Sequence, residues 1–343
     1  MKKIGIIIPL SVMLGLAAQA SAQVCETSRA ARDFYRCTFT SSEVVDLEQF
    51  AEDAAAAFGQ TDCRADLDAV LVVEAYGGEG GAGKKNSGMD GGKGGRRGYA
   101  QINRRLGDFA DELYLYVGVD GGSASSKDAI PGGSSTLVAD GDLTWIDDPS
   151  SVRDPSSVGI YAVAGGGGGG SNASGGGAGR RGGAGGFLAG NASSTTQAPG
   201  GDGRAGNSGF GGNEDGMGSG GRGRGSGGDG GPGIGGGTTV DDPSYEMWEG
   251  TGIGLASLFC TGGEGANNSG SGGGGFGCGG GGKSPNGRRN GAGGGGGSFV
   301  DRSDHGPSSL VATELRLTSP DAEEDSDDLL ADEPQIVLTL EVL

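Results

Sequence analysis

Glycine is concentrated in one part of this 343-residue chain, and that concentration restricts the folds open to it. All but four of the 82 glycines lie between residues 77 and 297, whereas ordinary usage is about 7% of a chain. Such a segment has few side chains with which to build a core, and hydrophobic residues make up only 34% of the whole chain. These proportions argue against an ordinary α/β enzyme of this length.

Short apolar runs interrupt the glycines and predict β-strands, because they are rich in β-branched or aromatic residues and are bounded by turn formers. The runs are Ala69–Tyr76, Tyr99–Asn103, Glu112–Val119, Leu143–Ile146, Gly159–Ala164, Gly254–Phe259, Ser298–Val300, Leu310–Thr318 and Ile336–Leu343. A flexible linker would not contain regularly placed apolar runs, so a disordered tract is the less favoured interpretation.

The uninterrupted glycine runs need a separate explanation. They are Gly165–Gly170, Gly272–Gly275, Gly279–Gly282 and Gly293–Gly297. Collagen needs Gly at every third position with abundant Pro, and calcium-binding nonapeptide repeats need an Asp that recurs at a fixed spacing. The sequence has neither of these two patterns. We expect extended helices with about three residues per turn, as in polyproline II. Their backbone N–H and C=O groups have no partners within the helix, so these groups must bond to neighbouring helices.

The first 22 residues are typical of a secretory signal peptide. Lys2 and Lys3 precede an apolar stretch over Ile4–Ala18, and Ala20-Ser21-Ala22 provides a small-x-small cleavage site. The apolar stretch is shorter than the roughly 18–20 residues of a spanning helix, which disfavours an uncleaved anchor. We expect a mature chain that begins at Gln23, has no transmembrane segment, and is extracellular, at the cell surface or in the periplasm of a bacterium.

All the cysteines follow this cleavage site, and an oxidising compartment favours disulfides between them. The candidates are Cys25, Cys37, Cys63, Cys260 and Cys278. Cys260 and Cys278 are the two in the glycine-rich half and are natural partners. The sequence does not choose a pair among the first three cysteines. A catalytic cysteine is disfavoured because the sequence has no His near any of them.

Residues 23–68 contain a single Gly and many good helix formers. Thr40 followed by Glu43 fits a capping box, and apolar residues then recur at helical spacing. These residues are Val44, Leu47, Phe50, Ala51, Ala54 and Phe58. The pattern predicts a helix over residues 42–57, ended by Gly59 as the C′ residue.

The order of these features divides the chain into five parts. They are a signal peptide at 1–22, an N-terminal helical cap segment at 23–68, a glycine-rich β domain at 69–318, an acidic loop at 319–333 and a C-terminal strand at 334–343. We therefore expect a mainly β protein preceded by a small helical segment.

The glycine-rich part resembles a known domain, and the resemblance rests on an ordered series of blocks over residues 69–300. The blocks are Tyr76-Gly77, Gly94-Gly95 to Tyr99, Leu113–Gly118, Tyr161–Gly170 and Gly293–Val300. This series is similar to the glycine-rich domain of the anaplastic lymphoma kinase and leukocyte tyrosine kinase receptors, and to similar domains in bacterial exported proteins. The resemblance implies a β-sandwich of tumour-necrosis-factor-like topology with hexagonally packed polyglycine-II helices inserted between strands. Receptor signalling does not follow, because the sequence has no kinase domain.

Other motifs give no support to catalysis or nucleic-acid binding. The chain carries 44 acidic and 25 basic residues, for a net charge of −19, and phosphate-backbone binding needs a basic face. The single histidine, His305, lies in a polar turn-like sequence. Residues 277–284 match a phosphate-loop pattern, but no strand-like sequence precedes them and Pro285 follows. We expect a non-enzymatic structural or adhesive module without a cofactor, whose partner is an extracellular protein or a surface ligand.

The alternative function is an exported hydrolase or a calcium-binding protein with an unrecognised site. Its candidate residues are Asp142, Asp147, Asp148 and Asp154. Calcium could also bind the acidic run at 321–333, although this run lacks EF-hand spacing. Binding to ice or another flat surface is a third alternative, which the scattered charged residues disfavour.

Overall fold

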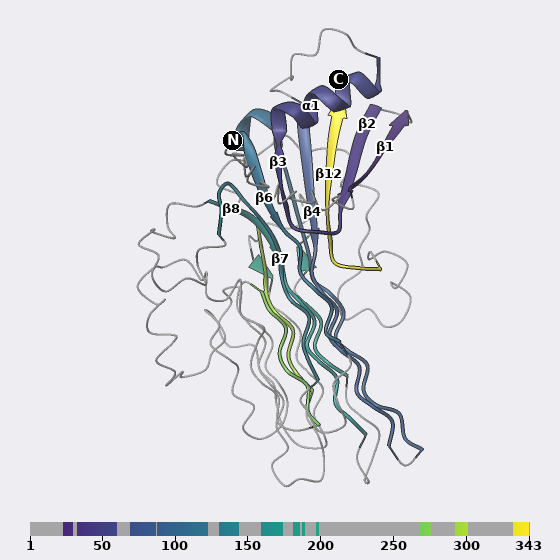
Figure 1. The fold of residues 1–343 in the computed structure, drawn as a ribbon. Helices are drawn as coiled ribbons and strands as arrows, with labels where there is room; N and C mark the ends of the chain where they lie inside the picture. Colours follow the sequence, from purple (N-terminus) through teal and green to yellow (C-terminus); the bar gives the residue numbers. More distant parts are fainter. Residues whose placement is uncertain are drawn as a thin grey trace, which may run out of the picture.

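The computed structural model describes twelve stretches of the chain. They are residues 23–29, 33–59, 69–86, 88–122, 130–143, 159–173, 181–185, 187–188, 197–198, 268–275, 292–300 and 332–342. This part of the chain is mainly β, with two six-stranded sheets and one short α-helix (Figure 1). The predicted mainly β class is therefore confirmed.

Both sheets are antiparallel except for one short parallel pair, β5 with β9. The first sheet has the order β1 (Gln23–Arg29), β2 (Asp33–Phe39), β12 (Gln335–Val342), β4 (Val70–Tyr76), β5 (Tyr99–Arg105) and β9 (Phe187–Leu188). The second has the order β10 (Gln197–Ala198), β11 (Ser298–Val300), β8 (Ile160–Ala164), β7 (Thr136–Ala139), β6 (Glu112–Tyr116) and β3 (Glu43–Asp46). A single 3-10 turn (Leu106–Asp108) lies between β5 and β6 in the described chain.

The hydrophobic core lies between the two sheets. β4 and β5 of the first sheet contact β8 of the second, and β5 also contacts β11. Alternate residues of β2, β4, β5, β6, β8 and β12 belong to one cluster, as expected for strands with one apolar face. Its fully buried members include Leu71, Val73, Ala75, Leu113, Val138, Ala162, Ile336 and Leu338. The strands therefore have a side-chain core of their own, separate from the glycine segments.

The helix α1 (Leu47–Ala57) covers the end of the sheets near the arrowhead of β12 (Figure 1). Its buried residues are Leu47, Phe50, Ala51 and Ala54, and the Phe50 ring lies 5.3 Å from that of Tyr35 on β2. The side chain of Asp46 accepts a hydrogen bond from the Gln49 N–H group, so Asp46 is the N-cap.

The helix expected over residues 42–57 begins later than predicted, and the capping box at Thr40 and Glu43 is wrong. Residues 43–46 pair with β6 instead, with Val44 opposite Tyr114. The β-branched pair at 44 and 45 favours this strand, and Asp46 offers a better cap for the helix behind it. Three strands precede α1, so the expectation of a helical segment is wrong for residues 23–46. The predicted end at Gly59 is confirmed, because its φ is +73° and its N–H donates to the Ala56 carbonyl.

Most strands expected in the described stretches are present. β4, β5, β6, β8, β11 and β12 fall on predicted runs, whereas β1, β2, β3, β7, β9 and β10 were not predicted. Leu143 is described but does not lie in a strand. Several predicted features fall outside the described residues: the signal peptide, the runs at 254–259 and 310–318, the glycines at 279–282 and the acidic loop up to residue 331.

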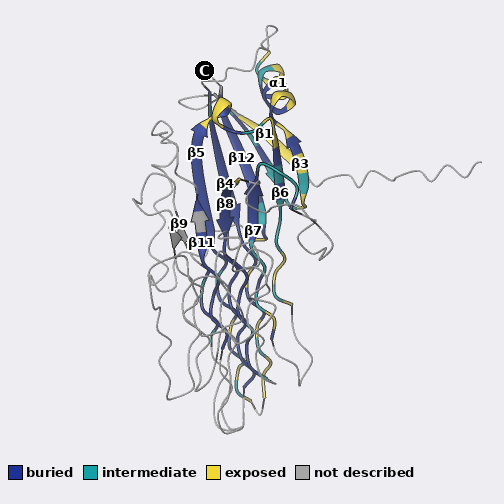
Figure 2. Ribbon diagram, turned by 90° about the vertical axis from the view of Figure 1, so that its left-hand side faces the viewer, coloured by how far each residue is buried: buried dark blue, intermediate teal, exposed yellow. Residues whose placement is uncertain are grey.

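Eight extended segments, which we call the glycine bundle, continue from the ends of the strands. They are residues 77–86, 89–98, 117–122, 130–135, 165–173, 181–185, 268–275 and 292–297. In Figure 1 the segments that leave β4, β6 and β8 run side by side, away from the end that α1 covers. Figure 2 shows that the centre of this bundle is as buried as the sheets.

The central segment of the bundle, residues 165–173, donates backbone hydrogen bonds to three neighbours in rotation. Its N–H groups at Gly166, Gly169 and Asn172 reach segment 268–275; those at Gly167, Gly170 and Ala173 reach segment 77–86; and that of Gly168 reaches Gly183. Residues three apart therefore bond to the same neighbour, which is the periodicity expected of an extended helix with about three residues per turn.

The carbonyl groups of this central segment bond to three further neighbours. Segment 89–98 donates to Gly165, Gly168 and Ser171, segment 292–297 donates to Gly166 and Gly169, and segment 130–135 donates to Gly167. Residues 165–173 thus have six hydrogen-bonded neighbours among the described segments. In this region backbone hydrogen bonds hold the segments together, as side-chain packing does for the sheets.

Glycine is required in the bundle for close approach rather than for an unusual backbone conformation. A Cβ atom at Gly167 would overlap the carbonyl oxygen of Gly95, and one at Gly168 would overlap that of Gly293. Positive φ occurs at only two described glycines, Gly59 and Gly88, and neither lies in the interior of the bundle. The missing side chain is therefore the property that the packing uses.

Candidate functional site

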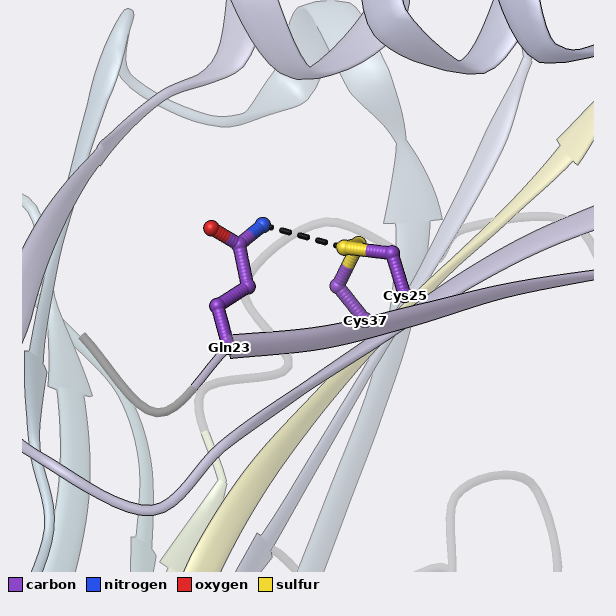
Figure 3. The surroundings of a disulfide bond; sticks show 3 residues. All are labelled: Gln23, Cys25 and Cys37. Carbon is purple, nitrogen blue, oxygen red and sulfur yellow. Dashed lines mark hydrogen bonds between the residues drawn. A yellow bond between two sulfur atoms is a disulfide. The ribbon is translucent and has the colours of Figure 1, made fainter. Parts of the chain in front are cut away.

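The structure pairs two of the five candidate cysteines. Cys25 on β1 and Cys37 on β2 lie directly opposite each other and form a disulfide, with Cα atoms 4.1 Å apart (Figure 3). The sequence had left the choice among the first three cysteines open. Cys63, Cys260 and Cys278 lie outside the described residues, so the pairing of Cys260 with Cys278 stays a prediction.

One of the four aspartates suggested for the alternative enzyme lies in the described chain. Asp142 accepts a hydrogen bond from the Tyr116 hydroxyl at 3.2 Å, and this hydroxyl in turn accepts one from the Leu143 N–H at 2.6 Å. These bonds fix the turn after β7 against β6. The other three aspartates lie outside the described residues: Asp147, Asp148 and Asp154. The described part of the chain therefore does not bring the four suggested residues together.

A hairpin of two glycine segments forms one outer border of the bundle. The N–H groups of Gly77, Gly80 and Gly83 donate to the carbonyls of Gly98, Gly95 and Gly92 at 2.8–3.0 Å. Every third residue of each segment points outward from the bundle. We call their side chains the hairpin edge: Glu79, Ala82 and Lys85 on one strand, and Asp90, Lys93 and Arg96 on the other.

The hairpin edge carries charges of both signs on a fixed backbone. Lys85 and Asp90, opposite each other near the tip, form an ion pair at 2.7 Å, with side chains 80% and 74% exposed. Ion pairs this exposed add little to stability. Their side chains are therefore free to serve contacts with another molecule without a cost to the fold.

A buried arginine fixes the base of this hairpin. The Arg97 guanidinium donates to the backbone carbonyl of Asp332 at 2.9 Å and lies 3.4 Å from the Asp120 carboxylate. Asp120 also accepts a hydrogen bond from the Glu79 N–H at 2.6 Å. Arg97 therefore joins two segments of the bundle to the chain that leads into β12.

Asparagine side chains terminate the bundle at its far end. Asn172, the residue after Ser171 in the central segment, accepts a hydrogen bond from the Lys84 N–H at 2.6 Å and donates to the side chain of Asn268 at 3.0 Å. Asn86 donates to the Ala173 carbonyl at 3.4 Å. These amides satisfy backbone groups where the glycine runs stop.

The first sheet has a second buried face, which is polar. The polar side chains on the side of this sheet away from the core form what we call the polar face. They are Arg36, Glu74, Tyr76, Tyr99, Gln101, Asn103, Thr339 and Glu341. Glu74, only 2% exposed, accepts hydrogen bonds from the hydroxyls of Tyr99 at 2.8 Å and Tyr76 at 3.3 Å. Arg36 lies 3.5 Å from its other carboxylate oxygen and donates to Thr339.

Burial raises the pKa of Tyr35 and of three tyrosines that bond to carboxylates. Burial, and then the charge of Glu74, raise the pKa of Tyr76 and of Tyr99 well above the ordinary value. Burial also raises the pKa of Tyr116 to about 12, with Asp142 acting in the same direction. The hydroxyl protons at these positions are therefore held as hydrogen-bond donors to carboxylates rather than poised for transfer at neutral pH.

Stability is expected to fall in alkaline solution because of these tyrosines. The folded state keeps protons that the unfolded chain releases above about pH 10, so this contribution is full below about pH 10 and is lost as pH rises towards the folded values. Chemical denaturation at about pH 9 and about pH 11 measures the loss. The variant Tyr116→Phe should lose less over this interval than the unchanged protein. A loss in Tyr116→Phe as large as that of the unchanged protein would contradict the assignment.

Among the described residues, no group of three or more His, Cys, Asp or Glu side chains is arranged to hold a metal ion. No helix in the described stretches is long and apolar enough to cross a membrane.

The polar face and the Arg97 contacts were not predicted. The charge inside the apolar run of β4, Glu74, was a visible signal, because a buried strand rarely carries an acid without a partner. Two of its partners, Arg36 and Tyr99, come from β2 and β5, and their distance along the chain hid them. The outward residues of the hairpin edge were also readable, because they recur at every third position of the two segments.

Comparison with known proteins adds no assignment to this geometry. No protein-family model matches the chain, and no curated protein is similar to it in sequence.

Proposed function

We propose that the protein is an exported, non-enzymatic structural or interaction module that acts at the cell surface, in the periplasm or outside a bacterial cell. The observation that carries this proposal is the bonding of residues 165–173 to six neighbouring segments at three-residue intervals. A body cross-linked by backbone hydrogen bonds in all lateral directions resists bending. Such a body suits a spacer or a display scaffold better than a catalyst whose loops must move.

The finer fold in this proposal is a β-sandwich of tumour-necrosis-factor-like topology with an inserted polyglycine-II bundle. The proposed fold is that of the glycine-rich domain of the anaplastic lymphoma kinase and leukocyte tyrosine kinase receptors. Support comes from the contacts of β4 and β5 with β8, and from the three-residue period of the hydrogen bonds. The exit of glycine segments directly from the strand ends is a further argument for it.

The hairpin edge is the proposed contact surface of the module. Its backbone is fixed by bonds to the bundle and by Arg97 at its base, so little ordering entropy is lost when its side chains meet a partner. Its charges are exposed, and charged groups at such a border chiefly determine specificity and the rate of association.

A binding experiment with intact cells tests this function. The mature protein, labelled through an added C-terminal tag, is incubated with cells of the bacterium that produces it, and the bound label is measured. We expect the unchanged protein to bind, and the triple variant Lys85→Gln, Asp90→Asn, Lys93→Gln to lose most of the bound signal. The variant should keep its fold, because the three side chains point outward from the bundle.

A matched control removes the same number of exposed charges from the other end of the molecule. The variant Glu26→Gln, Glu48→Gln, Glu52→Gln changes β1 and α1 only and should bind like the unchanged protein. Equal loss in both triple variants would mean that binding does not depend on the hairpin edge in particular. Absence of binding by the unchanged protein would overturn the interaction part of the proposal.

A further inference from the structure

The strand β1 begins at Gln23, the residue that follows the predicted cleavage site after Ala22. β1 pairs with β2 along its whole length, from Gln23 opposite Phe39 to Arg29 opposite Asp33. The sheet therefore already holds the residue that cleavage would make N-terminal. Once it is N-terminal, a glutamine can react with itself, because its side-chain carboxamide lies within reach of its own α-amine.

The side chain of Gln23 is exposed and has one weak partner. Its amide nitrogen, Nε2, donates to the Sγ atom of Cys25 at 3.1 Å (Figure 3), and sulfur is a weak hydrogen-bond acceptor. The carboxamide can leave this partner at little cost and turn towards the backbone nitrogen of its own residue.

We propose that Gln23 becomes a pyroglutamate residue once residues 1–22 are removed, an inference that rests on the processing step of the proposed function. The uncharged α-amino nitrogen attacks the side-chain carbonyl carbon, Cδ, and a new C–N bond forms. The bond from Cδ to Nε2 breaks, and this nitrogen leaves as ammonia after it takes up the proton that the α-amine gives up. No oxidant or second reactant is needed, because both reacting groups belong to one residue and the attack is intramolecular.

The modification would protect the first residue of β1, the strand at the border of the first sheet. β1 has one neighbouring strand in the described sheet, β2, and the Cys25–Cys37 disulfide holds these two strands together. A lactam at Gln23 removes the free amine on which aminopeptidases act and removes its positive charge. β1 is then protected chemically at its first residue and covalently two residues later.

Mass spectrometry of the N-terminal peptide tests the proposal. The full chain is expressed in an exporting bacterium, and the freshly isolated protein is reduced, alkylated and digested with trypsin, which cleaves after Arg29. The first peptide should be Gln23–Arg29. We expect most of it to be lighter by one ammonia and unreactive towards an amine-directed reagent.

Two different failures can be told apart in this experiment. A peptide that starts at Gln23 with a free amine overturns the modification and leaves the predicted processing intact. A chain that starts at any other residue overturns the modification together with the predicted cleavage.

The variant Gln23→Ala is the control, because it cannot form the lactam and changes an exposed side chain. It should yield an amine-reactive first peptide and lose its first residue to an aminopeptidase that spares the unchanged protein. Equal resistance of the two proteins would contradict the protective role.

Discussion

Replacement of Gly168 by alanine is expected to lower the free energy of unfolding by about 4 kcal/mol, at the upper end of the effects of single substitutions. The new Cβ would overlap the carbonyl oxygen of Gly293 in the adjacent segment. Neither segment can move aside cheaply, because Gly168 also bonds to Gly183 through its N–H and to Gly95 through its carbonyl. Urea denaturation followed by circular dichroism measures the change.

Two further glycines separate close packing from backbone conformation in this experiment. A Cβ at Gly122 would meet nothing within 4 Å, so Gly122→Ala should change stability by about 0.5 kcal/mol or less. Gly88 also has open space but a φ of +81°, so Gly88→Ala should cost about 1 kcal/mol through strain alone. A loss at Gly168 no larger than that at Gly88 would mean that the bundle is loosely packed in solution.

Replacement of Glu74 by leucine is expected to cost about 3 kcal/mol, because it removes the carboxylate that accepts hydrogen bonds from the buried hydroxyls of Tyr76 and Tyr99. The Arg36 guanidinium also loses its ionic partner, although its partial exposure reduces that contribution. The same denaturation measurement applies. Glu74→Gln keeps an oxygen that can accept from the tyrosines and should cost less.

The triple variant Glu74→Leu, Tyr76→Phe, Tyr99→Phe tests the cause of this loss. It removes the hydroxyls along with their acceptor, so most of the stability lost in Glu74→Leu should return. A triple variant as unstable as Glu74→Leu would show that the cost comes from the fit of leucine on the polar face and not from unsatisfied hydrogen bonds.

The strands that the sequence predicts correctly are those with local signals. β4 and β8 are apolar runs that stop where glycine begins, and β5 starts where a glycine segment ends, so the glycines delimit all three. β7, with four residues, is too short to show a period. β1 and β2 carry mixed polar and apolar residues, and β2 gains its second neighbour, β12, from the opposite end of the chain. Pairing over such a distance leaves no trace in a local window.

The start of α1 shows how pairing with a distant strand can override a local capping signal. Thr40 and Glu43 satisfy the capping-box spacing, but residues 43–46 gain more from pairing with β6. Asp46 then caps the helix with its own side chain. Tertiary pairing overrode a weaker local preference for helix at residues 43–46. This pairing depends on β6, which lies more than sixty residues away.

The candidate site was less predictable than the fold, because its contacts join residues far apart in the sequence. The position of Glu74 was readable, but the convergence of Arg36 and Tyr99 on it was not. The outward residues of the hairpin edge recur at every third position and could have been identified directly. The Cys25–Cys37 disulfide needed the register of β1 and β2, which the sequence did not provide.

The rotation of hydrogen-bond partners in residues 165–173 gives each glycine segment something like a reading frame. Gain or loss of one or two residues would redirect every later N–H group to a different neighbour. A change of three residues would keep each neighbour and only slide the segment along it by one turn. Length variation within the bundle is therefore tolerable in triplets, a constraint that ordinary loops and β-strands do not impose.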